Sequence, residues 1–186
     1  MKLRDSQSAY PTCPYLCFMK KNQRGFSLIE LLIVVVIIGI LASLAVAGLL
    51  ASKRSANEGS AVSSMRILHG AQMTYASSFG GGEFAGDIGA PTTTVFTELQ
   101  SRKLIDDVLG TATKSGYNFA GGREASSSTQ PAQFYFSAIP ISADQLAGTG
   151  NHRLGIGTDG VVRSDSTLTT HFANVAALAA APAMGN

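Results

Sequence analysis

The chain has 186 residues, of which 45% are hydrophobic and 14% are charged, and it contains 20 Gly, 2 Cys and no Trp. This length accommodates one modest domain with an appended segment. The charged share lies well below the roughly 25% of an average globular protein, which argues against a highly charged disordered chain, and the ordinary hydrophobic share argues against a polytopic transporter. The formal net charge of +2 is too nearly balanced to indicate a nucleic-acid-binding domain from charge alone.

The first 25 residues differ from the rest of the chain in charge. They contain five basic residues and one acid, so the remainder carries nine basic against eleven acidic groups and is mildly acidic. Both cysteines, Cys13 and Cys17, also lie there, without a nearby His or a second Cys pair that would complete a zinc site. No metal site and no cofactor are therefore expected. If this stretch is removed, the rest has no thiol and depends on packing for its stability.

One segment dominates the hydropathy, because Leu31 to Ser52 contains neither a charged residue nor Pro. About 20 apolar residues, at a rise of 1.5 Å per residue, cross a hydrocarbon core of roughly 30 Å. A cleaved secretory signal is an alternative, but its apolar region is usually only about 7 to 15 residues long. The simplest interpretation is a single-pass membrane anchor with a domain attached, and it leaves Glu30 unexplained.

Glu30 lies at the edge of this apolar run, where an ionised carboxylate loses hydration. A carboxylate at the centre of a membrane helix costs about 2.5 to 3.5 kcal/mol on insertion scales, and less near the interface, so it normally has a partner. A new amino terminus at Phe26 supplies the missing positive charge if the chain is cut between Gly25 and Phe26. Alternatively, Glu30 snorkels to the headgroups at the start of the helix, where the helix dipole also favours a negative charge.

Residues 20–32 resemble the class III signal of type IV pilins and type II secretion pseudopilins. The segment joins a basic leader ending in Gly, an aromatic first mature residue, an acid five places into the mature chain and an uninterrupted apolar helix. The resemblance implies that a prepilin peptidase recognises Arg24 and Gly25, cuts after Gly25 and methylates the amine of Phe26. It also implies that Glu30 pairs with the Phe26 amine of a neighbouring subunit during filament assembly, which removes the cost of two unpaired charges and sets the axial register.

Translation from Met19 gives the short basic leader that is common in this family, so we expect Met19 to be the functional start. Residues 1–18 are otherwise an extension without a separate fold. The predicted organisation is a prepilin leader at 1–25, a hydrophobic transmembrane or filament-core helix at 26–52, an amphipathic continuation of that helix at 53–79, a globular α+β domain at 80–172 and an Ala-rich flexible tail at 173–186.

The helix is predicted to continue beyond the membrane, because no Pro occurs from Phe26 to Phe79. After Arg54 the apolar residues recur at three- or four-residue spacing, which indicates an amphipathic helix with one buried face. This stripe is formed by Val62, Met65, Leu68, Gln72, Tyr75 and Phe79. The resemblance implies the α+β pilin fold, in which the long N-terminal helix packs on a small antiparallel β-sheet.

Shorter elements follow in the rest of the chain. The pattern predicts a helix from Val95 to Leu109, strands at 117–119, 133–138, 152–156 and 161–163, and a polar loop from Gly121 to Pro131. Asp159-Gly160 predicts a hairpin turn, because Gly accepts positive φ. The tail from Ala173 is either frayed or forms a short packing helix.

Catalysis, calcium binding and DNA binding are weaker interpretations of the same sequence. His69, His152 and His171 occur without a Gly-x-Ser-x-Gly elbow, a phosphate loop or a His-Glu-x-x-His motif, so an enzyme is not expected. Asp159 and Asp165 lack the spacing of an EF-hand, which favours the turn over a calcium site. Six cations are explained better as scattered solubility charges than as a DNA-binding surface, namely Arg102, Lys103, Lys114, Arg123, Arg153 and Arg163.

The sequence therefore predicts a structural subunit rather than an enzyme. The resemblance implies a prepilin that is stored in the bacterial inner membrane with a cytoplasmic N-terminus and a periplasmic C-terminal domain. A prepilin peptidase, an assembly platform protein and an ATPase are the implied partners, and the product is a homopolymeric or mixed filament. A type II secretion pseudopilin that drives protein export is the first alternative. A membrane-anchored binding domain that never polymerises is the alternative from another class.

Overall fold

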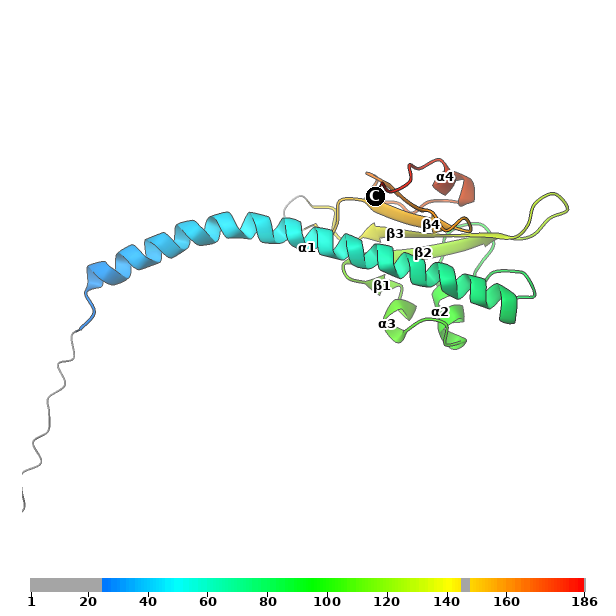
Figure 1. The fold of residues 1–186 in the computed structure, drawn as a ribbon, viewed down its shortest axis with the longest axis horizontal. Coiled ribbons are helices and arrows are strands. Elements are labelled where there is room, and N and C mark those ends of the chain that lie inside the picture. Colours follow the sequence, from blue (N-terminus) through cyan, green and yellow to red (C-terminus); the bar gives the residue numbers. More distant parts are fainter. Residues whose placement is uncertain (1–24, 145–147, 186) are drawn as a thin grey trace, which may run out of the picture. The chain divides into compact units, whose positions relative to one another are not determined.

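A long helix, α1, spans Leu28–Ser78 in the computed structural model, which describes residues 25–144 and 148–185 (Figure 1). The chain divides into two compact units between Leu41 and Ala42, so α1 begins in the first unit and ends in the second. The helix stops before three consecutive glycines, where Gly81 and Gly82 have φ of 59° and 99°. Left-handed residues of this kind close helices because Gly accepts positive φ without a steric penalty. The predicted continuation of the helix past the apolar run is confirmed.

The second unit contains a five-stranded sheet in the order β1-β2-β3-β4-β5, with every neighbouring pair antiparallel. The strands are β1 (Thr113–Lys114), β2 (Tyr117–Glu124), β3 (Gln133–Pro140), β4 (Arg153–Gly157) and β5 (Val162–Asp165). The turn between β4 and β5 contains Gly160 at a φ of 72°, as expected for the Asp159-Gly160 pair. Together with α1 this sheet confirms the predicted α+β pilin fold.

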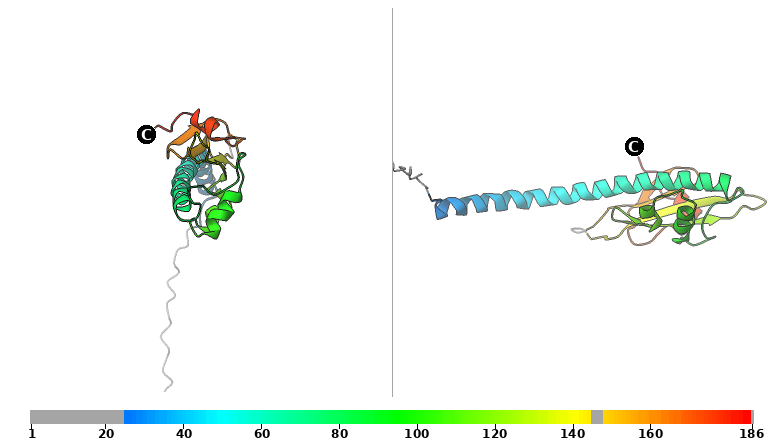
Figure 2. Two further views of the ribbon diagram at one scale, coloured as in Figure 1. Left: turned by 90° about the vertical axis from the view of Figure 1, so that its right-hand side faces the viewer. Right: turned by 90° about the horizontal axis from the view of Figure 1, so that it is seen from below.

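The core lies between the sheet and the second-unit part of α1, which runs alongside the strands (Figure 2). Side chains alternate between the two faces of a strand. Phe134 and Phe136 of β3 accordingly lie in the cluster that contains Met65 of α1, whereas Tyr135 packs on the other side with Phe172 and the short helix α4 (Val175–Ala179). The sheet therefore has a helix on each face, and only the α1 side carries the larger core.

The predicted stripe on α1 is buried over most of its length. Met65 and Leu68 are fully buried, and Tyr75 is almost so, whereas Phe79 at the end of the helix is about half exposed. Gln72 is a buried polar member of the stripe, and its amide exchanges two hydrogen bonds with the backbone of Ala85, at 3.0 and 2.9 Å. A buried amide is stable only when it is paired in this way. Gln72 thus joins the segment around Ala85, which follows α1, to the helix by hydrogen bonds.

The segment predicted as one helix, residues 95–109, forms two helices instead. They are α2 (Thr94–Ser101) and α3 (Asp107–Gly110). The break lies at Lys103, whose φ of 58° is in the left-handed region that helices of L-residues do not continue through. Asp106 then adopts an extended conformation, and its carboxylate accepts a hydrogen bond from the Leu109 amide at 3.2 Å, which caps α3. The prediction of a single helix was wrong for this reason.

The polar loop predicted from Gly121 begins later, because β2 continues to Glu124. A Cβ on Gly121 would lie 2.5 Å from the Phe136 ring, so the strand needs glycine where that aromatic side chain crosses it. The backbone of Gly121 also exchanges hydrogen bonds with Thr92 at 2.8 and 2.9 Å. The glycines that suggested a loop are therefore strand residues in close packing.

The C-terminal segment forms a short packing helix, the second of the two predicted options. Asn174 caps α4 by accepting a hydrogen bond from the Ala177 amide at 2.7 Å, and Leu178 is buried against the sheet. The Tyr135 hydroxyl lies within hydrogen-bond distance of the carbonyls of Gly89 and Ala173, at 2.7 and 2.8 Å, and burial raises the pKa of Tyr135 to about 12, so this donor stays protonated. Residues 182–184 then pair with the outer side of β5 through two backbone hydrogen bonds of 3.1 and 2.9 Å.

Replacing Met65 by alanine is expected to destabilise the domain by about 2–5 kcal/mol, because the fully buried side chain leaves a cavity between α1 and the sheet. Met73→Ala is the matched control, since Met73 lies on the same helix and is 39% exposed. Its cost should be within about 0.5 kcal/mol of zero. Urea unfolding of the full chain in detergent, followed by tyrosine fluorescence, measures both. Equal losses for the two variants would contradict the assignment of the core face.

Candidate processing and assembly site

The start of α1 forms a local hydrogen-bonded structure around Glu30. The Leu31 amide donates to the carbonyl of Ser27 at 3.2 Å, which makes Ser27 the N-cap residue. The Glu30 carboxylate accepts a hydrogen bond from the Ser27 amide at 3.4 Å. This is the glutamate half of a capping box, in which the third helical residue reaches back to the N-cap amide. A carboxylate here is also favoured by the positive end of the helix dipole.

Sequence reasoning missed this local role of Glu30, although its signal was present. Ser27 and Glu30 have the Ser-x-x-Glu spacing of a capping box at the start of an apolar run. A carboxylate has about four lone-pair positions, so one bond to the Ser27 amide leaves room for another donor. Capping within one subunit and pairing with a second chain are therefore compatible in this geometry.

The cleavage position predicted from the sequence is open in the described structure. A Cβ on Gly25 would meet no heavy atom within 4 Å, and the Phe26 side chain is 71% exposed. An enzyme that cuts a peptide bond needs close access to the backbone on both sides of it, and both residues offer that access. Arg24, the third predicted recognition residue, lies outside the described residues.

The apolar side chains that follow are exposed to an unusual degree for a folded protein. Every residue from Phe26 to Val46 is exposed, and the helix is long and apolar enough there to cross a membrane. Exposed apolar patches beyond a few hundred Å² mark membrane or protein contacts. This part of α1 therefore needs an apolar environment supplied from outside the chain.

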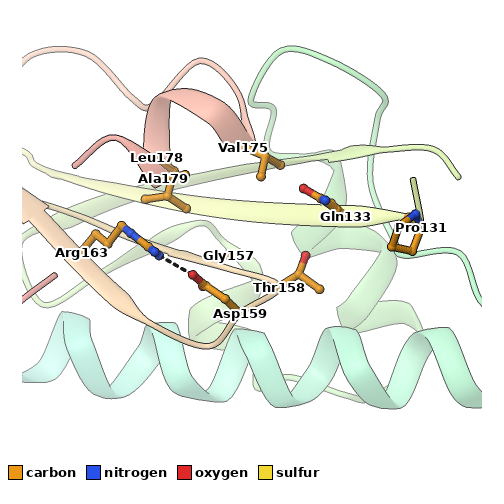
Figure 3. Close-up of a pocket in the computed structure, with 10 residues that line it drawn as sticks. Pro131, Gln133, Gly157, Thr158, Asp159, Arg163, Val175, Leu178 and Ala179 are labelled. Atoms are coloured by element: carbon orange, nitrogen blue, oxygen red, sulfur yellow. Dashed lines mark ion pairs between the residues drawn. The ribbon is translucent and has the colours of Figure 1, made fainter. Parts of the chain in front are cut away.

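A cavity of about 280 Å³ lies on the domain between the β4–β5 turn and α4 (Figure 3). Leu178 and Val175 line one side of it, and Asp159 and Arg163 form an ion pair of 2.7 Å at the other. The second oxygen of Asp159 accepts a hydrogen bond from the Val161 amide at 3.1 Å. The turn thus uses both oxygens of Asp159, and the described residues contain no group of three His, Cys, Asp or Glu side chains that is suited to a metal ion.

The three histidines have separate environments in the second unit. The His69 ring packs on Phe134 with 5.6 Å between centroids, and His152 lies 3.4 Å from a Glu58 oxygen. His171 is partly buried, and burial together with the charge of Arg153 lowers its pKa. Each histidine thus takes part in local packing or pairing, and no shared catalytic constellation forms around them in the part of the chain that the structure describes.

Four of the six candidate cations pair with carboxylates of the same domain. Arg123 lies 2.6 Å from Glu83 and Lys114 lies 3.6 Å from Asp106, while the remaining pairs are Arg153 with Asp165 and Arg163 with Asp159. Pairing of this kind lowers the potential that these groups present to a phosphate backbone. The Arg123–Glu83 pair also joins β2 to the connection that precedes α2, and the pairs of Asp159 and Asp165 lie at the β5 edge of the sheet.

Comparisons with known proteins concern the N-terminal part of the chain. Residues 20–46 match the family described as the prokaryotic N-terminal methylation motif. The type II secretion system core protein G of Dickeya chrysanthemi is 47% identical over 50 residues, which is 27% of this chain and 33% of that protein. The protein of the same name from Klebsiella pneumoniae is 44% identical over 55 residues, covering 30% of this chain and 39% of the relative.

A third relative has the same name and a similar coverage. The type II secretion system core protein G of Escherichia coli K12 is 47% identical over 54 residues, covering 29% of this chain and 37% of the relative. The chain thus spans between 33% and 39% of the length of these curated relatives. No solved structure matches the chain.

Proposed function

We propose that this chain, whose N-terminal segment is similar to type II secretion system core protein G and matches the prokaryotic N-terminal methylation motif, is a member of the type IV pilin and type II secretion pseudopilin family and a filament subunit made as a prepilin. One observation carries the proposal. The chain has a packed domain, yet it exposes every residue from Phe26 to Val46 along a helix that follows a methylation motif. Lipid covers such a surface in the stored subunit, and the helices of neighbouring subunits cover it in a filament. The family is one of structural subunits, not of enzymes.

Processing is the first step of the proposed function. The prepilin peptidase recognises Arg24 and Gly25, cuts after Gly25 and methylates the new amine of Phe26. The open position of Gly25 and the exposed Phe26 support this step, because the peptide bond between them is free of side-chain cover. Met19 is the proposed start of translation, so the leader that cleavage removes is residues 19–25. With that start neither cysteine is made, and if translation starts at Met1 instead, cleavage removes both.

Assembly is the second step. The Glu30 carboxylate pairs with the Phe26 amine of a neighbouring subunit, because two unpaired charges in an apolar filament core are each costly and their pairing removes both costs. The transmembrane or filament-core part at 26–52 then forms the centre of the polymer. The amphipathic part at 53–79, the domain at 80–172 and the tail at 173–186 form its outer layer. A platform protein and an ATPase drive this step from the membrane.

The membrane is the proposed store of subunits before assembly. Residues 31–52 have the length and composition of a single membrane span. Lys20, Lys21 and Arg24 precede this span and favour a cytoplasmic N-terminus, which places the domain in the periplasm. The cell surface or a periplasmic filament is the final location.

A type II secretion pseudopilin is the second candidate, and a specific observation favours it. The three relatives described above are all named type II secretion system core protein G. Under this proposal the filament stays in the periplasm and drives protein export. A membrane-anchored domain that does not polymerise is the candidate from another class.

Mass spectrometry of the N-terminal peptide separates these candidates. We expect a peptide that begins with methylated Phe26 both in native membranes and in sheared filaments. The same peptide in membranes alone would favour the periplasmic pseudopilus. An intact bond between Gly25 and Phe26 in the functional protein would contradict processing and leave only the membrane-anchored domain.

A further inference from the structure

The end of the apolar run in α1 determines which residues lie at the membrane surface. The uncharged run from Leu31 to Ser52 has 22 residues, and Lys53 and Arg54 follow it. At 1.5 Å per residue this run is about 33 Å long, close to the roughly 30 Å of a hydrocarbon core. Because the run is only slightly longer than the hydrocarbon core is thick, Ser52 of an inserted helix lies near the outer boundary of the hydrocarbon.

A loop of the domain is bound to α1 just beyond this boundary. The Arg54 guanidinium donates to the carbonyl of Gly148 at 3.3 Å, and the Asn57 amide donates to the carbonyl of Thr149 at 2.9 Å. The polar layer on each side of a bilayer is about 5 to 8 Å thick, and residues 53–57 cover about that distance along a helix. Residues 148–149 therefore lie at the depth of the lipid headgroups when the helix is inserted.

An exposed isoleucine lies beside this loop. The Ile141 side chain is 52% exposed although its backbone is fixed, because its amide donates to the carbonyl of Gly116 at 2.9 Å. The next residue, Ser142, accepts a hydrogen bond from the Thr149 amide at 3.0 Å, which joins Ile141 to the loop at the headgroup depth. Lys53 is exposed on α1 just beyond the same boundary, and an apolar and a basic side chain at one depth match the chemistry by which proteins bind anionic bilayer surfaces.

We propose that Ile141, Lys53 and residues 148–149 form a docking face for the anionic phospholipid surface, and that this face holds the stored subunit's domain against the bilayer. Ile141 enters the interfacial layer, and Lys53 contacts lipid phosphates. The proposal rests on the membrane storage proposed above. Docking restricts the rotation of the domain about the inserted helix, so subunits reach the assembly machinery with one face already turned to the membrane.

Ile88 provides a matched control at the other end of the sheet. It is 64% exposed and forms a bridge with Arg123, whereas Ile141 follows the residue that pairs with Tyr117. Tyr117 and Arg123 are six positions apart on β2, which corresponds to about 20 Å. The two exposed isoleucines are thus well separated along the strands, and only Ile141 belongs to the docking face.

Single tryptophan variants of the full chain test the proposal, because the chain contains no Trp and each introduced ring is the sole reporter. Ile141→Trp, Ile88→Trp and Leu44→Trp are reconstituted in vesicles of phosphatidylcholine and phosphatidylglycerol that contain brominated lipid. Brominated lipid in both leaflets makes the readout independent of protein orientation. All three side chains are exposed, so circular dichroism should show an unchanged fold.

We expect brominated lipid to quench Ile141→Trp at least about twofold more than Ile88→Trp, as an interfacial side chain requires. Leu44→Trp reports the inserted helix and should be quenched strongly. Equal weak quenching of the two isoleucine variants, with strong quenching of Leu44→Trp, would overturn the docking face and leave membrane storage intact. Weak quenching of Leu44→Trp would overturn both.

Discussion

Replacing Glu30 by alanine is expected to abolish filament assembly while the subunit still accumulates in the membrane. In the proposed filament, the substitution leaves the Phe26 amine of a neighbouring subunit without a partner in an apolar core. Breaking a buried ion pair in this way costs about 3–5 kcal/mol, which corresponds to about two to four powers of ten in the association constant at each junction. Filaments recovered by shearing, relative to the subunit level in the membrane, measure the effect.

Two further variants separate charge pairing from helix capping. Glu30→Gln keeps an oxygen that can accept the hydrogen bond from the Ser27 amide, but it removes the charge. Ser27→Ala removes the hydroxyl of the N-cap residue at a cost of about 1 kcal/mol and keeps the charge. We expect Glu30→Gln to fail in assembly like Glu30→Ala, and Ser27→Ala to assemble. Normal filaments from Glu30→Gln would show that the carboxylate acts only as a cap.

Replacing Gly25 by valine is expected to reduce leader cleavage by about 100-fold, a loss typical of a scissile bond displaced by about 1 Å from the catalytic groups. The branched side chain occupies space next to the backbone that the peptidase must approach, and that space is open in the described structure. The uncut protein keeps its leader, so an immunoblot of whole cells shows a larger species. Mass spectrometry then locates the remaining bond between Gly25 and Phe26.

Gly39→Ala is the control for this substitution. A Cβ on Gly39 would also meet no heavy atom within 4 Å, but Gly39 lies inside α1, where alanine stabilises a helix by about 1 kcal/mol relative to glycine. Cleavage of Gly39→Ala should equal that of the unchanged protein. Normal cleavage of Gly25→Val would contradict the assignment of the processing site.

The features that the sequence predicts well are those governed by local chemistry. The absence of Pro and the apolar stripe correctly predict α1, and Asp159-Gly160 correctly predicts the turn between β4 and β5. These patterns are reliable because the spacing of side chains and the freedom of Gly act within a few residues. The α+β fold required the family resemblance in addition, since sheet order depends on contacts between distant segments.

The errors arise where tertiary packing decides the local structure. Gly121 has the composition of a loop, yet the Phe136 ring from the neighbouring strand makes it a strand residue. Lys103 carries no turn signal, yet it is left-handed between α2 and α3, which bury Leu99 and Leu109 in the same core. The cap formed by Ser27 and Glu30 is different, because its Ser-x-x-Glu spacing is local and can be read from the sequence.

The pairing of residues 182–184 with β5 has a consequence for how copies of this protein associate. An uncovered edge strand presents free backbone donors and acceptors on which a strand from another molecule can add. Here the protein's own C-terminal segment occupies that position beside β5. This segment therefore blocks the addition of a foreign strand at this edge, which is a common route to aggregation. In the proposed filament subunit, this protection leaves self-recognition to the apolar helix.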